Sequence, residues 1–137
     1  MIQYKFLEHT ADIKFQAFGK TIEECFSNCA YAMIKSICEQ KVKAKKLFSF
    51  KVQGNDLENL LYNFLEEFLF LFDSKKIVLS KINKIKIDAN KFKLECSFYG
   101  DSTEDYNFNS DIKAVTYNDM FIKKQKNKFV AQVVLDV

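Results

Sequence analysis

Two amphipathic segments of helical period constrain the fold of this chain more than any other feature. In residues 22–38, apolar side chains recur every three or four positions, and in residues 57–72 the apolar stripe is wider and rich in Leu and Phe. A helix with a broad apolar face needs an apolar layer to cover it. We therefore predict two helices packed on a sheet; for the second helix, the alternative is an exposed groove for a partner.

Capping residues mark where both helices begin. Thr21-Ile22-Glu23-Glu24 has the pattern of a capping box, in which the first and last side chains bond each other's backbone N–H groups. The second helix is predicted to begin after Gly54, with Asn55 or Asp56 as its N-cap, and to end at Asp73-Ser74.

The segments between and around the helices read as strands. The predicted strands are residues 2–8, 13–18, 47–53, 77–87, 91–99, 112–116, 120–124 and 128–135. Short turns at residues 88–90 and 126–127 link several of them as hairpins, which indicates antiparallel pairing. The expected fold class is α+β, with two amphipathic helices packed on one mostly antiparallel sheet or on a pair of sheets. A chain of 137 residues is expected to form one domain, residues 1–137.

Composition excludes several classes of protein. No apolar run approaches the roughly 20 uncharged residues that cross a bilayer, and the N-terminus lacks the pattern of a signal peptide, so we expect a cytoplasmic protein with no membrane partner. All 21 basic residues are Lys, and the net charge is only +3 against 18 acidic residues. A typical nucleic-acid binder has a more one-signed balance, and without Arg there is no bidentate grip on phosphate.

The common cofactor and nucleophile motifs are also missing from the sequence. Three glycines cannot build a phosphate-binding loop or a dinucleotide-binding turn. The four cysteines form no CxxC pair, and the only histidine is His9, so a zinc site is not indicated. Cys25 and Cys29 share the apolar face of the first helix and are predicted to lie in the core. A lone histidine is more often structural than catalytic.

The last predicted strand carries a carboxylate beside the chain end. Its alternation puts Asp136 on the strand's second face, next to the terminal carboxylate of Val137. Further acidic residues stand after the first predicted strand and around residues 111–119. If the ends of these strands meet, Asp12, Asp136 and Val137 form an oxygen-rich site for a hard cation, with Lys113 as a nearby positive group.

Several stretches, taken in order along the chain, resemble one family. They are Tyr4 to Ile13 with the motif His9-Thr10-Ala11-Asp12, Phe18 to Glu24, Gly54 to Leu61, Phe70 to Asp73, Ile112-Lys113-Ala114-Val115-Thr116-Tyr117, and Leu135-Asp136-Val137. This series is similar to the archeases over essentially the whole chain. The resemblance implies a protein cofactor, not a stand-alone enzyme. Its implied partner is a GTP-dependent RNA-splicing ligase of the RtcB type, which seals tRNA exon halves through a guanylylated histidine.

The resemblance also implies roles for particular residues. The family's metal site corresponds here to Asp12, Asp136 and the backbone of Val137, while Lys113 corresponds to a lysine that acts in ligase activation, and His9 is a candidate supporting residue. Calcium is the expected cation, and manganese and magnesium also suit such oxygen ligands. Contact with tRNA is expected only through the ligase.

One position departs from the family pattern, and two other functions stay open. Asn118 stands where the family commonly has a histidine after the Ile112–Tyr117 motif, so a role of that histidine is not available here. The alternatives are a small metal-dependent phosphodiesterase that uses Asp12 and Asp136, and a passive RNA-binding module that uses the lysines.

Overall fold

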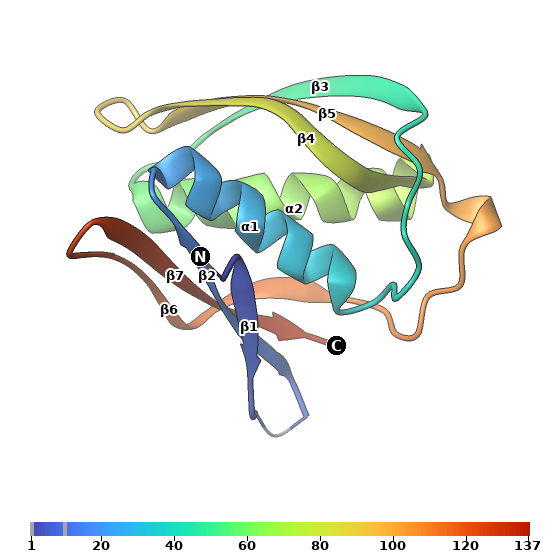
Figure 1. Ribbon diagram of the computed structural model, residues 1–137, viewed down its shortest axis with the longest axis horizontal. Helices are drawn as coiled ribbons and strands as arrows, with labels where there is room; N and C mark the ends of the chain where they lie inside the picture. Colours follow the sequence, from blue (N-terminus) through green and yellow to red (C-terminus); the bar gives the residue numbers. More distant parts are fainter. Residues whose placement is uncertain (1, 10) are drawn as a thin grey trace.

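Two helices form a middle layer between two antiparallel sheets in the computed structural model, which describes residues 2–9 and 11–137 (Figure 1). The helices are α1 (Ile22–Lys35) and α2 (Leu57–Lys75). The four-stranded sheet has the order β1-β2-β7-β6 and the three-stranded sheet the order β3-β5-β4. The strands are β1 (Tyr4–Leu7), β2 (Ile13–Gly19), β3 (Lys46–Gln53), β4 (Ile77–Asp88), β5 (Lys93–Ser102), β6 (Ala114–Gln125) and β7 (Lys128–Asp136), and a short 3-10 helix, η1 (Thr103–Asp105), follows β5. The predicted α+β class is confirmed.

The helices are covered on both sides because a sheet lies against each side of their layer. Helix α1 packs on β2 and β7 of one sheet and on β4 of the other, and α2 packs on β6 and on β3 and β4. Even polar residues of α1 are buried, and their polar atoms are bonded: the Asn28 amide donates to the Phe18 carbonyl at 2.7 Å, and the Ser27 hydroxyl donates to the Glu23 carbonyl. Burial on both sides explains why the apolar stripes are so wide.

The predicted N-caps of both helices are confirmed. The Thr21 hydroxyl accepts a hydrogen bond from the Glu24 backbone N–H at 3.1 Å, and the Glu24 carboxylate accepts one from the Lys20 N–H. The Asp56 carboxylate accepts from the Asn59 N–H at 2.7 Å, so Asp56, and not Asn55, caps α2. These bonds use N–H groups that have no partner inside a helix.

The predicted helix ends are less accurate. Helix α1 ends at Lys35, three residues before the predicted end at Cys38, although Ile37 and Cys38 stay buried in a following turn. The apolar pattern reports burial, and burial continues here after the helical hydrogen bonds stop. Helix α2 continues past Asp73-Ser74 to Lys75 and ends where Lys76 adopts a left-handed conformation with φ 57°.

One pair of predicted strands is a single strand in the structure. Residues 114–116 and 120–124 belong to β6, whose pairing with β7 is irregular between Thr116 and Phe121, and Ile112 and Lys113 of the first predicted strand precede it. Asp119 has φ 53° in this irregular part, a conformation that Asp tolerates better than most residues. Residues 117–119, between the two predicted strands, resemble a turn in sequence. The sequence therefore predicts eight strands, whereas the described residues form seven.

The core lies between the sheets and contains all four cysteines. Cys25, Cys29, Cys38 and Cys96 are free and buried, which confirms the core position predicted for Cys25 and Cys29. Burial raises the pKa of the Cys96 thiol to about 12 and also raises that of Cys29. The thiols of Cys29 and Cys96 are therefore protonated packing residues and not nucleophiles. Among the described residues, no helix is both long and apolar enough to cross a membrane.

Candidate functional site at the ends of β2, β6 and β7

The register of the four-stranded sheet brings the two candidate carboxylates to one edge. Strand β2 pairs with β7 so that Ile13 lies opposite Leu135; Asp12 directly precedes Ile13, and Asp136 directly follows Leu135. Strand β6 pairs on the other side of β7, with Ala114 opposite Asp136. Residues that are more than 120 positions apart in sequence therefore become neighbours at the ends of paired strands.

Lys113 joins the same edge through its backbone. Its N–H donates to the carbonyl oxygen of Asp136 at 2.7 Å, immediately before β6 begins. The Lys113 residue is exposed while its neighbour Ile112 is buried, as the alternation of residues 112–115 predicts. Val137 follows Asp136 directly and is half-buried against the core. The predicted meeting of the strand ends is therefore observed.

His9 contacts Asp12 across the hairpin that joins β1 to β2. The His9 Nδ1 atom lies 3.6 Å from an Asp12 carboxylate oxygen, and both side chains are about 30% exposed. Ala11, between them, has φ 67°, which bends the chain at this point. Thr10 of the same motif lies outside the described residues. A protonated His9 would compete with a cation for the Asp12 carboxylate.

The donor atoms available at this edge are few. Within residues 2–9 and 11–137, no group of three or more His, Cys, Asp or Glu side chains is arranged to hold a metal. The candidate set has only two carboxylate side chains, Asp12 and Asp136, and any further protein oxygen must come from the backbone near Val137. All these donors are oxygens, which suits calcium, manganese or magnesium better than zinc, and most ligands of such a cation would be water.

Three contacts hold the neighbouring segment of β6 in position. The Tyr117 ring stacks on the Tyr62 ring of α2 with centroids 4.5 Å apart and planes 8° apart, and its hydroxyl accepts from the Asn59 amide at 2.7 Å. The Thr116 hydroxyl donates to the Val134 carbonyl at 2.9 Å. The last residues of the Ile112–Tyr117 motif therefore attach β6 to α2 and β7, next to Lys113.

The structure adds an ion pair that sequence reasoning missed. Lys14 Nζ lies 3.5 Å from an Asp119 carboxylate oxygen on the outer face of the four-stranded sheet. This ion pair joins β2 to β6 across β7, which lies between them in the sheet. Lys14 follows Asp12 by two residues and is the second residue of β2. Its position in an alternating strand was visible in the sequence, but Asp119 is brought to it only by the irregular pairing of β6.

Comparison with known proteins identifies the family. The family model described as the archease protein family matches residues 4–137. The chain is 38% identical to protein archease of Methanosarcina barkeri over 98% of this chain and 96% of that protein, and 37% identical to protein archease of Pyrococcus furiosus over the full length of both. A Drosophila melanogaster protein archease-like is 32% identical over 99% of this chain and 91% of its own length.

Solved structures agree with the fold. The solution structure of a Methanobacterium thermoautotrophicum protein matches with a TM-score of 0.82 and 32% identity, over 98% of this chain and 99% of that one. A crystal structure described as an archease, possible chaperone, from Thermotoga maritima has a TM-score of 0.63 at 20% identity, over 97% and 96% of the two chains, which supports the fold alone. On the family match and the full-length relatives together, the chain belongs to the archease family.

Proposed function

We propose that this chain is a protein cofactor that activates an RNA-splicing ligase of the RtcB type, with a divalent cation bound at the ends of β2 and β7. The observation that carries the proposal is the strand register, which pairs Ile13, the residue after Asp12, with Leu135, the residue before Asp136, together with the bond from the Lys113 N–H to the Asp136 carbonyl. Membership of the archease family supports the same conclusion. In this proposal the chain does no ligation chemistry itself, and it reaches tRNA through the ligase.

The proposed cation ligands are the Asp12 and Asp136 carboxylates and a backbone oxygen of Val137. Calcium accepts about six to eight oxygen ligands in flexible geometry, so water molecules complete its shell at a site with few protein donors. The bound cation supplies positive charge at a partly open surface, where the ligase's own metal or nucleotide pocket can be ordered. His9, whose Nδ1 atom lies 3.6 Å from the Asp12 carboxylate, is a candidate supporting residue beside the proposed site.

Lys113 is the proposed contact to the partner. Its side chain is exposed and makes no ion pair with any described residue, while its backbone is fixed by the bond to Asp136. A free ammonium group on a fixed backbone suits an anionic group of the ligase, its nucleotide or its RNA. Promoting guanylylation and turnover in this way needs no nucleophile on the chain.

The direct test is multiple-turnover RNA ligation by a cognate ligase, with and without this chain. We expect the chain to raise both the number of turnovers and the rate at which labelled GTP guanylylates the ligase in the absence of RNA. In a parallel arm with RNA and calcium or manganese but no ligase, the RNA should stay intact. RNA cleavage that is lost in Asp12→Asn would instead support a phosphodiesterase, and a ligase that works equally well without the chain would overturn the proposal.

The cation is tested separately by thermal unfolding. A ligand that binds only the folded chain, at 100 times its Kd, raises the free energy of unfolding by about 2.7 kcal/mol. We expect calcium or manganese to raise the melting temperature of the parent, and Asp12→Asn or Asp136→Asn to abolish that increase. Asp105→Asn, at an exposed carboxylate of η1, is the matched control and should keep it. An unchanged increase in both site variants would mean that the cation binds elsewhere.

A further inference from the structure

Positive charge is concentrated on the three-stranded sheet. Residues 41–53 and 75–95, a quarter of the chain, contain twelve of the 21 lysines but only two of the 18 acidic residues. This quarter therefore has ten more positive than negative charges, and the rest of the chain has seven more negative than positive. A lysine-rich composition alone would spread lysines evenly, so the concentration is a property of this region. The small net charge of +3 conceals it.

The lysines of this region face solvent from one side of the sheet. Lys84 and Lys86 of β4 lie opposite Ser97 and Glu95 of β5, and all five lysines on the outward positions of the three strands are exposed. Adjacent strands are about 4.8 Å apart, and residues two apart on a strand about 6.8 Å apart, so the side chains form a closely spaced grid. The outward lysines are Lys51, Lys81, Lys84, Lys86 and Lys93. We refer to this surface as the lysine face.

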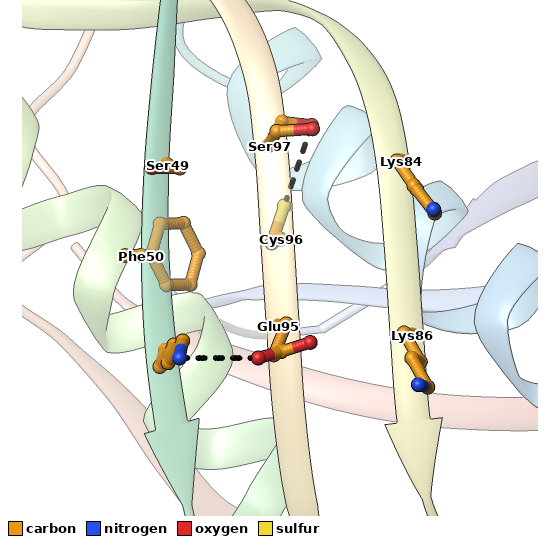
Figure 2. Close-up of a pocket in the computed structure, with 8 residues that line it drawn as sticks. Ser49, Phe50, Lys84, Lys86, Glu95, Cys96 and Ser97 are labelled. Carbon is orange, nitrogen blue, oxygen red and sulfur yellow. Dashed lines mark hydrogen bonds and ion pairs between the residues drawn. The ribbon is translucent and has the colours of Figure 1, made fainter.

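The centre of the lysine face is hollowed (Figure 2). A depression of about 300 Å³ lies between Lys84 and Lys86 on β4 and Lys51 on β3, where the short side chains of Ser49 and Ser97 leave room. This is the volume of roughly ten liquid waters, enough for a hydrated phosphate group. Among the described residues, neither Lys84 nor Lys86 has a carboxylate partner within ion-pair distance.

The single acidic residue at the centre does not neutralise this surface. Glu95 is paired with Lys51 at 3.2 Å, but both side chains are more than half exposed, so the pair is weak and open to exchange. The linker before β3 extends the positive surface, because the Ser80 hydroxyl of β4 bonds the Val42 carbonyl and so holds Lys41 and Lys43 beside Lys81.

The chemistry of the lysine face favours phosphate over a protein partner. The cores of protein interfaces are enriched in aromatic residues and depleted in Lys. The lysine face has the opposite composition: it is rich in Lys, and its most exposed large apolar residue is a single Leu47, which is 53% exposed. Ammonium groups neutralise backbone phosphates as point charges and read no base sequence. We propose that the lysine face binds the phosphate backbone of RNA directly and without sequence preference, in addition to the contact with tRNA that the proposed function makes through the ligase; the choice of RNA over DNA rests on that proposed function.

The position of this surface separates it from the candidate cation site. The lysine face belongs to the three-stranded sheet, whereas Asp12, Lys113 and Asp136 lie at an edge of the four-stranded sheet, and the helix layer stands between the two sheets (Figure 1). RNA on one sheet would therefore leave the opposite sheet free for a protein partner. The excess of negative charge elsewhere repels phosphate and directs it to the lysine face.

The proposal is tested by fluorescence anisotropy. A labelled single-stranded RNA of about 20 nucleotides is titrated with the full chain at salt concentrations between 50 and 200 mM. Each lost phosphate contact reduces the salt slope by about 0.7 and costs about fivefold in affinity at 0.1 M salt, so Lys84→Gln with Lys86→Gln should weaken binding about 25-fold. The matched control is Lys123→Gln with Lys124→Gln, which removes the same charge from exposed lysines of β6 on the other sheet. It should bind within about twofold of the parent.

Two further arms make the result specific. Lys84→Arg with Lys86→Arg keeps both charges and should keep the affinity and the salt slope. A DNA strand of the same sequence should bind with similar affinity, because the backbone and not the sugar is contacted. All variants should melt at the parent temperature, since the exchanged side chains are exposed.

The following outcomes would overturn the proposal. One is a parent chain that does not bind RNA at 50 mM salt, and another is an equal loss of binding in the two glutamine variants, which would indicate attraction by overall charge. A third is a parent chain that does not bind RNA combined with a Lys84→Gln, Lys86→Gln variant that no longer binds the ligase. This result would make the lysine face a protein interface. The binding assay contains no ligase and the guanylylation assay contains no RNA, so failure of this inference and failure of the proposed function are distinguishable.

Discussion

The stacked pair Tyr62 and Tyr117 makes a quantitative test of how β6 is held on α2. Tyr117 is 51% exposed, so its truncation to Ala loses about half of a large side chain's burial energy, or roughly 1 kcal/mol. Offset or parallel aromatic pairs add about 0.5–1.5 kcal/mol beyond burial. We therefore expect Tyr117→Ala to lower the free energy of unfolding by about 2 kcal/mol.

A double-mutant cycle separates the stacking energy from burial. Tyr62→Ala, Tyr117→Ala and the double variant are compared by urea unfolding followed by circular dichroism, and we expect a coupling energy of about 1 kcal/mol. The control cycle pairs Tyr117→Ala with Tyr99→Ala, because Tyr99 lies on the three-stranded sheet, across the helix layer. That cycle should be additive within about 0.5 kcal/mol.

Additive effects of the two tyrosine changes would refute the proposed stacking. If the Tyr62 and Tyr117 changes add within about 0.3 kcal/mol, the rings do not stack in solution, and the segment after Lys113 is not anchored to α2. Tyr117→Phe keeps the ring and loses only the bond from Asn59, so it should cost less than about 1 kcal/mol.

Four further expectations concern single positions. Lys113→Ala should change stability by less than about 0.5 kcal/mol yet strongly reduce stimulation of multiple-turnover ligation; a stable variant that stimulates like the parent would make Lys113 an ordinary surface residue. A C-terminal extension after Val137 should impair metal binding and activation more than an N-terminal tag, and full activation by the extended chain would remove Val137 from the site. The Tyr106 hydroxyl, the Ser102 N–H and Lys45 hold the pKa of Asp101 below its usual value. The ionised Asp101 carboxylate thus stabilises the fold above its unfolded pKa of about 3.9, and this stabilisation is lost as the pH falls through the lower folded pKa. Asp101→Asn should therefore be less stable than the parent at neutral pH, and its free energy of unfolding should depend less on pH in an acid titration. Gly19→Ala would set a methyl group 2.8 Å from the Glu24 carbonyl carbon and closer still to the Cys25 nitrogen, so urea unfolding should show a loss of more than about 3 kcal/mol; a loss below 1 kcal/mol would show that α1 can shift.

The sequence by itself determined the elements and their class. Capping chemistry at Thr21 and Asp56 is local, because a side chain bonds backbone N–H groups within its own first turn, and both caps are as predicted within one residue. Helical and alternating periods likewise report which side of a segment is buried. The α+β class, the hairpin pairing and the buried cysteines follow from these patterns.

The places where sequence reasoning failed are those where a segment's neighbours decide its conformation. The apolar pattern of α1 continues through Ile37 and Cys38, but the helix stops at Lys35 because burial in a turn produces the same pattern. Tyr117-Asn118-Asp119 reads as a turn, yet pairing with β7 on both sides keeps it within one irregular strand. Local preference is weak compared with the hydrogen bonds of a sheet.

Only the tertiary structure decided which distant residues meet. Sequence reasoning placed Asp12, Lys113 and Asp136 at strand ends, but only the β2 to β7 register and the bond from Lys113 to Asp136 bring those strand ends to one edge. It also counted the lysines only as part of a net charge of +3, and a sum over the chain carries no information on position. Strand pairing brings β3, β4 and β5 side by side and turns their alternate lysines outward, so a surface charge arises from segments that are separate in sequence.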